Sequence, residues 1–404
     1  MRIERLADLG DAPGVLRAVA DAGRRCGLPP PAALIGDWFA SRAVIAPTVT
    51  ATPCERMFDV RPGHGPHVGG GWFGYLGYPD GAPRIPAAAG GWSDCVLRQD
   101  SDGHWWYESL SGAPVPAWLT DITAAPAGAY TIDWRAPDRA AHRAGVLACL
   151  EAIAAGEVYQ ACVCTQFTGR ISGDPLDFFV DAVARTAPAR AAYIAGDWGA
   201  VASLSPELFL SRHGRRVISS PIKGTLPLTD SPSALRSSVK DVAENIMIVD
   251  LVRNDLGRLA DIGSVTVPEL LRVRRAPGVW HLVSTVAAAI PAETPMATVL
   301  EATFPPASVT GTPKGRARQL LSHWELDSRG VYCGTVGLAS PAAGTELNVA
   351  IRTVEFDPHG RAVLGVGGGI TADSDPDREW QECLDKAASI VRQLSQSRAF
   401  NTAS

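Results

Sequence analysis

The sequence lacks the features of a membrane or secreted protein. No apolar run reaches the ~18 residues that a membrane helix needs, and no apolar core of a signal peptide follows Met1 to Arg5. The eight cysteines form no CxxC pair, so we expect neither a zinc site nor a disulfide scaffold. Reduced thiols are typical of the cytoplasm, and we expect a cytoplasmic protein.

A strong excess of one charge is also missing. The net charge is −5, so no nucleic acid and no membrane is expected as the main partner, although a local cationic pocket for a small acid is compatible with it. Hydrophobic residues make up 46% of the chain and charged residues 20%. These values are normal for a globular protein with a substantial core.

The composition changes near residues 130–138. Residues 1–130 are rich in Pro and Gly and contain many short apolar runs, so they predict a mostly β region that is interleaved with the rest. Residues 138–396 predict a core in which blocks of strands are interrupted by helices, and 397–404 a frayed tail. This order predicts an α+β protein and not a regular βαβ alternation.

Hydrophobic periodicity predicts the individual elements. Helices are expected at 12–26, 139–155, 177–186, 234–259, 297–300, 314–323 and 376–395. Strands are expected at 69–78, 105–107, 158–168, 191–195, 200–204, 216–220, 262–271, 281–288, 330–339, 346–356 and 362–368.

A lysine stands out in the stretch Pro221-Ile222-Lys223-Gly224-Thr225. It lies just before Gly, where the strand predicted at 216–220 stops, so rigid backbone can hold it against a ligand. If Lys223 is shielded from water, its amine can act as a nucleophile. The alternative is a solvated Lys at a turn, and only the rest of the chain can decide between the two.

Carboxylates gather on two predicted helices. The last helix begins at Asp375-Pro376, and Glu379, Glu382 and Lys386 share one of its faces. Two carboxylates one turn apart are good ligands for Mg²⁺, although a solvated face with a Glu382–Lys386 pair is the alternative. Glu244 precedes an apolar run, where an acid pairs, binds a metal or caps the helix.

Two glycine-containing stretches favour an anion. Gly367-Gly368-Gly369 follows a predicted strand and would expose backbone N–H groups, unless it forms a flexible turn. Thr310 and Gly311 precede the helix predicted at Lys314, which suits an anion at a helix N-terminus.

Together these motifs resemble those of the chorismate-utilising enzymes, which include anthranilate, aminodeoxychorismate, isochorismate and salicylate synthases. The motifs lie at 221–225, 243–258, 304–314, 367–370 and 375–391. The resemblance is strong over 156–394 and weak over the first 130 residues. It implies chorismate as the substrate and large antiparallel sheets packed as a sandwich with flanking helices.

Two positions discriminate within this family. Isochorismate and salicylate synthases have a water-activating Lys where this chain has Gln160, so the chain resembles the ammonia-using members. Anthranilate synthases have Ala where this chain has Lys223. The pattern therefore resembles component I of the aminodeoxychorismate synthases, which act toward p-aminobenzoate and folate.

The resemblance also implies roles for individual residues. Mg²⁺ held by Glu244 and Glu382, with Glu379 nearby, would bind the ring carboxylate of chorismate. Glu207 would protonate the departing C4 hydroxyl, and Lys223 would attack C2 before ammonia attacks C4.

Other residues would bind the substrate. Arg352 and Lys386 would bind carboxylate groups, assisted by Tyr332 and by the backbone of Gly367-Gly368-Gly369; the motif containing Thr310 and Gly311 belongs to the same set. His281 would line the site, unless it is an ordinary core histidine.

No glutaminase motif is visible, so the resemblance implies a separate glutamine amidotransferase subunit as the ammonia donor. Two rival functions are an anthranilate synthase component I and a non-catalytic subunit that only binds the amidotransferase. The chain departs from its relatives at Thr312, where Ala is usual, and at Pro306-Ala307, which replaces a Gly-rich pair.

Overall fold

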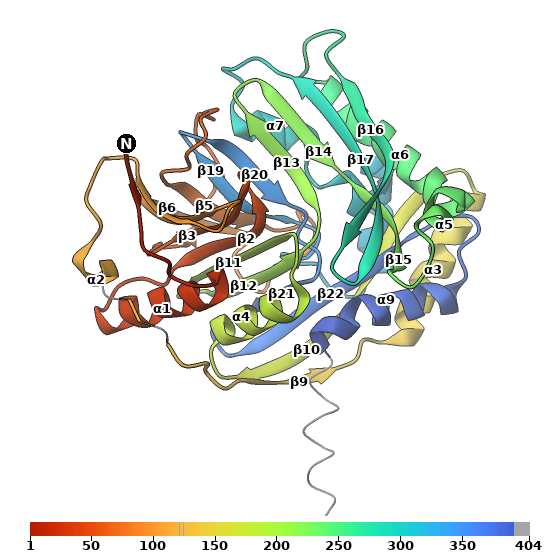
Figure 1. Cartoon of the computed structure of the whole chain (residues 1–404). Coiled ribbons are helices and arrows are strands. Elements are labelled where there is room, and N and C mark those ends of the chain that lie inside the picture. The colour runs from red at the N-terminus through yellow and green to blue at the C-terminus, as the bar shows by residue number, and fades with distance from the viewer. Residues whose placement is uncertain (121, 124, 392–404) are drawn as a thin grey trace, which may run out of the picture.

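The protein contains two large antiparallel sheets with helices on their outer faces (Figure 1). The computed structural model describes residues 1–120, 122–123 and 125–391. The predicted tail at 397–404 and the end of the last predicted helix lie outside this part. The predicted α+β class and the sandwich of antiparallel sheets are confirmed.

The first sheet has 12 strands. In spatial order they are β1 (Arg2–Arg5), β8 (Trp105–Ser109), β7 (Cys95–Asp100), β3 (Ser41–Ala46), β2 (Ala32–Trp38), β11 (Arg190–Gly196), β12 (Gly199–Ser205), β21 (Thr353–Phe356), β22 (Arg361–Ile370), β10 (Gln160–Ser172) and β18 (Gly311–Thr312), and β9 (Thr131–Arg135) also pairs with β10.

The second sheet has 10 strands. In spatial order they are β15 (Ile222–Pro227), β17 (Val279–Ala289), β14 (Arg216–Ser220), β13 (Leu208–His213), β20 (Gly344–Asn348), β19 (Thr335–Ser340), β5 (Gly71–Leu76), β6 (Ala88–Ser93) and β4 (Thr52–Pro53), and β16 (Thr266–Ala276) also pairs with β17. Strands from the first 110 residues therefore belong to both sheets.

The helices of the described residues are α1 (Ala12–Arg25), α2 (Ala117–Thr120), α3 (Arg139–Ala154), α4 (Pro175–Thr186), α5 (Pro232–Ser237), α6 (Val239–Gly257), α7 (Met296–Thr303), α8 (Lys314–Trp324) and α9 (Pro376–Val391), with a 3₁₀ turn at Ala307–Val309. None of them is both long and apolar enough to span a membrane.

Apolar packing between the sheets and helices holds this arrangement together. Side chains such as Val44 of β3 and Phe73 of β5 fill the space between the sheets. Phe179 of α4 belongs to the core between the helices and the first sheet, and Ile248 of α6 to the core against the second. Burial of this apolar surface is the main force that fixes the sheets and helices relative to one another.

Three predicted features differ from the structure. The long helix at 234–259 is two helices, because Ser238 ends α5 and its side chain caps α6 by accepting from the Asp241 N–H. The strand at 346–356 is β20 and β21, which belong to different sheets. Lys223 does not lie where a strand stops, because β15 begins at Ile222 and continues the pairing with β17 through a bulge.

Candidate active site

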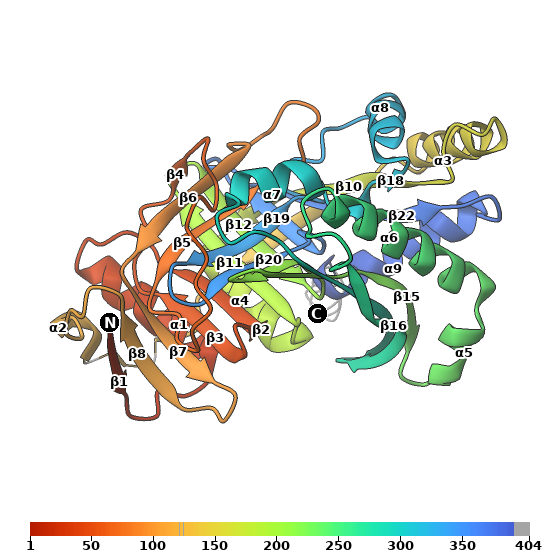
Figure 2. The same cartoon turned by 90° about the horizontal axis from the view of Figure 1, so that it is seen from above.

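Two chain crossings between the sheets lie side by side at the centre of the candidate site. Glu207 lies between β12 and β13, and Arg352 lies between β20 and β21. The Val349 N–H donates to the Glu207 carbonyl at 3.0 Å, and the Leu204 N–H to the Arg352 carbonyl at 3.1 Å. These bonds hold a carboxyl group and a guanidinium at the same junction. The elements α6, α9 and β15 lie on one side of the molecule (Figure 2).

Lys223 points toward a glycine on the neighbouring sheet. A Cβ added to Gly369 would stand 3.1 Å from Lys223 Nζ, 3.2 Å from Glu244 Oε2 and 3.4 Å from Gln160 Oε1. Only 11% of the Lys223 side chain is exposed, and Nζ lies 3.9 Å from Glu244 Oε2. The amine is therefore a largely buried group among polar side chains, and the alternative of a solvated turn Lys is excluded.

The glycines themselves are placed differently from the prediction. Gly367, Gly368 and Gly369 do not follow the strand but lie within β22, opposite Cys164, Val163 and Cys162 of β10. On the other side, β21 pairs with β22 only as far as Leu364. No strand of the described residues thus pairs with this edge of the glycines, and the Gly367 carbonyl accepts from Lys386 Nζ at 2.7 Å.

The three predicted metal ligands face the same glycines. Glu379 Oε2 would be 3.0 Å, and Glu382 Oε1 3.7 Å, from a Cβ on Gly368. Lys240 Nζ is 2.9 Å from Glu379 Oε1 and 3.9 Å from Glu244 Oε1. In the described part of the chain the three carboxylates do not offer three oxygens within 4.8 Å of one another, and the Lys240 ammonium pairs with two of them.

The donor set nevertheless fits a cation. Glu244 Oε1, Glu379 Oε2 and Gln160 Oε1 are buried and have no hydrogen-bond donor among residues 1–120, 122–123 and 125–391. Buried acceptors without a donor are uncommon in proteins, and carboxylate and amide oxygens are the ligands that Mg²⁺ prefers.

Burial and the nearby lysines shift the pKa values of these carboxylates in opposite directions. Burial raises the pKa of Glu244 despite the attraction of Lys223 and Lys240. Burial also acts to raise the pKa of Glu382, but Lys386, which lies 2.7 Å away, and the other lysines outweigh it and lower that pKa. Lys386 is therefore held by Glu382 and the Gly367 carbonyl.

Glu207 is an acid whose pKa suits proton donation near neutral pH. The residue is only 3% exposed, and burial raises its pKa from the ordinary 4.5 to about 7, with Ser308, Lys223 and the Ile222 N–H opposing the shift. A carboxyl group that titrates near neutral pH can donate a proton under physiological conditions.

Another side of the site is formed by His281 and Arg352. His281 Nδ1 lies 2.9 Å from Thr225 Oγ1, and burial together with Arg352 lowers the pKa of His281 to about 4. The Arg352 backbone has a φ of 51°, and burial lowers the pKa of its guanidinium. Among the described residues this guanidinium has no carboxylate within 4.0 Å, so it is available to an anion.

Comparison with known proteins decides the family. The model of the family described as chorismate binding enzyme matches residues 99–392. The chain belongs to the chorismate binding enzymes. The family predicted from the motifs is therefore confirmed.

Relatives and solved structures agree with this assignment. The chain is 36% identical over 363 residues to aminodeoxychorismate synthase component 1 of Escherichia coli (strain K12), covering 83% of this chain and 80% of that protein. It is 39% identical over 288 residues to the protein of that name from Klebsiella aerogenes, covering 69% of this chain and 64%, less than two thirds, of that protein.

The crystal structure of anthranilate synthase component I from Streptococcus pneumoniae TIGR4 superposes with a TM-score of 0.70 at 25% identity and covers 90% of both chains. The Escherichia coli isochorismate synthase MenF gives a TM-score of 0.72 at 19% identity, with 96% of this chain and 93% of that chain covered. This second likeness concerns the fold alone.

In this chorismate binding enzyme, the predicted substrate-binding residues Thr310, Gly311 and Tyr332 make contacts within the protein. Thr310 Oγ1 donates to the Pro306 carbonyl at 2.9 Å, so its hydroxyl is already in use. Gly311 pairs with Ala161 of β10, next to Gln160. The Tyr332 ring lies over Gly365, where a Cβ would be 2.2 Å from it.

Sequence reasoning missed two residues of the site. Gln160 discriminates between family members in the sequence, but the residue is only 2% exposed and its Oε1 faces Gly369, as Lys223 Nζ does. Lys240 was overlooked, although it precedes Glu244 by one helical turn, and this spacing places the two side chains on one face.

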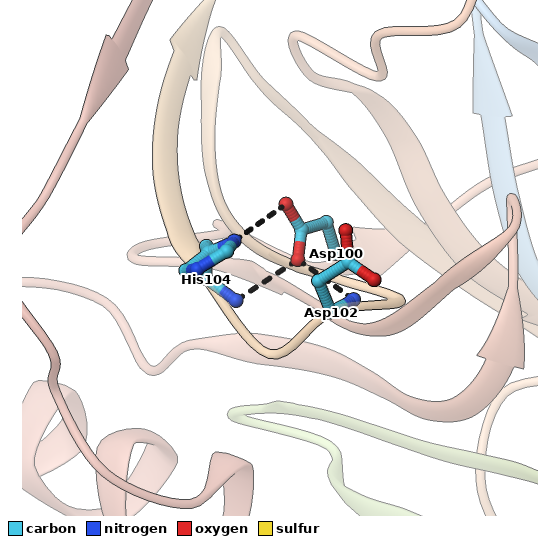
Figure 3. A group of neighbouring side chains, drawn as sticks. All are labelled: Asp100, Asp102 and His104. Atoms are coloured by element: carbon cyan, nitrogen blue, oxygen red, sulfur yellow. Dashed lines mark hydrogen bonds and ion pairs between the residues drawn. The ribbon is translucent and has the colours of Figure 1, made fainter.

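A further group of possible metal ligands lies on the β7–β8 hairpin (Figure 3). Asp100 Oδ1 there accepts from the backbone N–H groups of Asp102 and His104 at 3.0 and 2.9 Å, and Asp100 Oδ2 accepts from Trp106 Nε1 at 2.8 Å. The carboxylate therefore holds the turn together, and we assign no metal to it.

Proposed function

We propose that this chain is component I of an aminodeoxychorismate synthase, which converts chorismate and ammonia to 4-amino-4-deoxychorismate on the way to p-aminobenzoate. One observation carries the proposal: Lys223 Nζ is buried beside Glu244, Gln160 and Gly369. A binding module would have no need of the whole set of Glu207, Lys223, Glu244, Glu379 and Glu382. The relatives named aminodeoxychorismate synthase component 1 support the same function.

Arg352 supports chorismate, which carries two carboxylates, as the substrate. A half-buried guanidinium that has no carboxylate partner among the described residues suits one of these groups. Lys386 is already bound to Glu382 and to the Gly367 carbonyl, so it fixes Glu382 and adds positive charge. His281 is neutral at physiological pH because of its low pKa, so it acts as a polar wall of the site and not as a charge.

The residues present fit Mg²⁺ as the cofactor. Glu244 and Glu382 would hold it, with Glu379 nearby, and when bound it neutralises the ring carboxylate of the substrate. The three unpartnered acceptors of Glu244, Glu379 and Gln160 support this assignment.

The side chains can carry out two successive substitutions. The Lys223 amine forms a bond to C2, the ring double bonds shift, and the C4–O bond breaks as Glu207 gives its proton to the leaving hydroxyl. Ammonia then forms a bond to C4, and the bond between C2 and Lys223 breaks. The Glu207 carboxylate takes the excess proton from the new amine, which restores the acid.

We further propose that a separate glutamine amidotransferase subunit supplies the ammonia and that the enzyme works in the cytoplasm. The eight free cysteines are compatible with a reducing compartment. Free ammonium salts replace the amidotransferase in the test below, so the test does not depend on the partner.

The test is product analysis with chorismate, Mg²⁺ and ammonium chloride. We expect a product that aminodeoxychorismate lyase converts to p-aminobenzoate. Fluorescent anthranilate as the main product would assign the chain to the anthranilate synthases instead, and the absence of both products would favour the non-catalytic alternative.

A second measurement tests the role of Lys223 directly. Incubation with chorismate and Mg²⁺ but no ammonia should add the mass of the dehydrated substrate to Lys223. Lys223→Ala should lose this adduct and lower kcat/KM by about 10³-fold or more, while it still binds chorismate in a titration. Undiminished amination by Lys223→Ala would show that the amine is not the nucleophile.

A further inference from the structure

A small cavity adjoins Glu207 where α6, α7 and the 3₁₀ turn meet. It has a volume of about 20 Å³. Among its lining residues are Glu207, Asp255, Thr303, Ala307 and Ser308. A site needs roughly 10–15 Å³ and two or more polar partners to hold a water molecule. This cavity therefore has the size and the polar groups to bind one water beside the acid of the site.

The Ser308 hydroxyl is a buried group of this lining that the rest of the protein does not satisfy. The residue is 7% exposed, and its Oγ has no hydrogen-bond partner among the described residues. The hydroxyl of Thr303, in contrast, donates to the Val299 carbonyl at 2.7 Å within α7. Buried polar groups without a partner are uncommon, so Ser308 Oγ calls for a partner in the cavity.

Asp255 supplies an acceptor on another wall of the cavity. Lys314 Nζ donates to Asp255 Oδ2 at 2.6 Å, and the two side chains are largely buried. The ammonium neutralises the carboxylate, so the pair adds little net charge beside Glu207. Because a carboxylate offers about four acceptor positions, Asp255 can accept from a water as well as from Lys314.

The chemistry of the three polar groups sets the direction of the hydrogen bonds around a water in this cavity. The water donates one hydrogen to Asp255, which as a carboxylate can only accept. Its second hydrogen is available to a Glu207 oxygen, and its own oxygen accepts from the Ser308 hydroxyl. The Glu207 oxygen that faces the cavity is thus held as an acceptor, and the proton of the neutral acid lies on the other oxygen, ready for the C4 hydroxyl.

We propose that the cavity binds one water molecule and that Ser308 and Asp255, acting through this water, are positioning residues for Glu207. The role in positioning the acid rests on the proposed function, whereas the water site itself does not. Loss of the water has two consequences. The ionised Glu207 loses a donor, so its pKa rises further, and the neutral carboxyl group becomes free to turn its proton away from the substrate.

Two substitutions remove the water in different ways. Ser308→Ala deletes the hydroxyl that donates to it. Ala307→Val adds two methyl groups to a residue that lines the cavity and is 4% exposed, so the space for the water is filled while the Ser308 hydroxyl stays. Thr303→Val is the matched control, because it removes a hydroxyl of the same lining that already bonds within α7.

Infrared difference spectroscopy without chorismate follows the titration of Glu207, and the Glu207→Gln variant identifies its band. Ser308→Ala and Ala307→Val should each move the midpoint upward by about one to two pH units, the value of a hydrogen bond to a charged group, and Thr303→Val should not. An unmoved midpoint in Ser308→Ala overturns the proposal. A midpoint that moves in Ser308→Ala but not in a folded Ala307→Val variant shows a direct effect of the hydroxyl and overturns the water site.

A crystal structure checks the water directly, because an ordered water should lie within hydrogen-bond distance of Ser308, Asp255 and Glu207. A cavity without density for it overturns the water site, whether or not Ala307→Val folds.

The rate of adduct formation on Lys223 tests the positioning role. It is measured without ammonia at saturating chorismate and about pH 6, below the Glu207 pKa of about 7, so that the acid is protonated in wild type and variant alike. Ser308→Ala should lower this rate by about tenfold with an unchanged Kd for chorismate, and an unchanged rate overturns the positioning role. If the wild-type protein forms neither adduct nor product, the proposed function and the positioning role fail, while the titration and the crystal structure still decide on the water site.

Discussion

Replacement of Glu207 by Gln should stabilise the folded protein near pH 8 while it abolishes amination. The carboxyl group is 3% exposed, and burial raises its pKa from 4.5 to about 7. Glutamine has almost the same shape and carries no charge at any pH. The variant therefore removes the cost of an ionised buried group without creating a cavity.

The magnitude and its sign follow from the two pKa values. The folded state holds the proton more tightly than the unfolded state, so stability is highest below the unfolded value of 4.5 and falls as pH rises through about 7. At about 1.4 kcal/mol per pKa unit, the loss near pH 8 amounts to about 3 kcal/mol. The Glu207→Gln variant should regain most of this lost stability near pH 8 and almost none of it near pH 4.5.

Urea unfolding of both proteins across this pH range measures the difference, and kcat for amination measures the loss of the acid. Glu151→Gln, on the exposed face of α3, is the control and should show no comparable change. A difference in the free energy of unfolding between wild type and Glu207→Gln that stays constant with pH would refute the argument. It would show that the folded protein does not keep the Glu207 carboxyl group protonated to a higher pH than the unfolded chain does.

Two further predictions concern the metal and the substrate. Lys240→Met removes the ammonium that lies 2.9 Å from Glu379 Oε1, so Mn²⁺ binding without chorismate, followed by electron paramagnetic resonance, should become several-fold tighter; weaker binding would contradict the competition. Arg352→Met should raise the KM for chorismate by about 10- to 100-fold, the value of a charge-assisted hydrogen bond, with little change in thermal stability because no carboxylate partner is lost; an unchanged KM would exclude Arg352 from the binding site.

Local patterns were enough to predict the helices that carry clear ends. Asp11 and Asp138 accept from backbone N–H groups in the first turns of α1 and α3, and Asp375 does the same for α9. Caps and periodicity depend on residues within a few positions of one another, so the sequence alone contains them. The shared face of Glu379 and Glu382 was predictable for the same reason.

The change of sheet at Val349–Arg352 was not predictable in this way. Both β20 and β21 are buried throughout, and a buried apolar run has the same appearance whether it forms one strand or two. The prediction of a single strand at 346–356 therefore missed the crossing that places Arg352 beside Glu207. Its backbone φ of 51° marks a turn that no neighbouring Gly or Pro signals.

The same limit explains why Lys223 could be read from its own surroundings only as a solvated turn or a nucleophile. What decides between them is the register of β10 on β22, which sets Cys162 opposite Gly369 and so places Gln160 near the lysine. Cys162 and Gly369 are more than 200 positions apart in the sequence, and pairing over such distances is fixed by tertiary packing. The position of the Lys223 amine among Glu244, Gln160 and Gly369 is thus a property of the assembled sheets. The chemistry of Lys223 depends on α6, β10 and β22, which are far apart in the sequence.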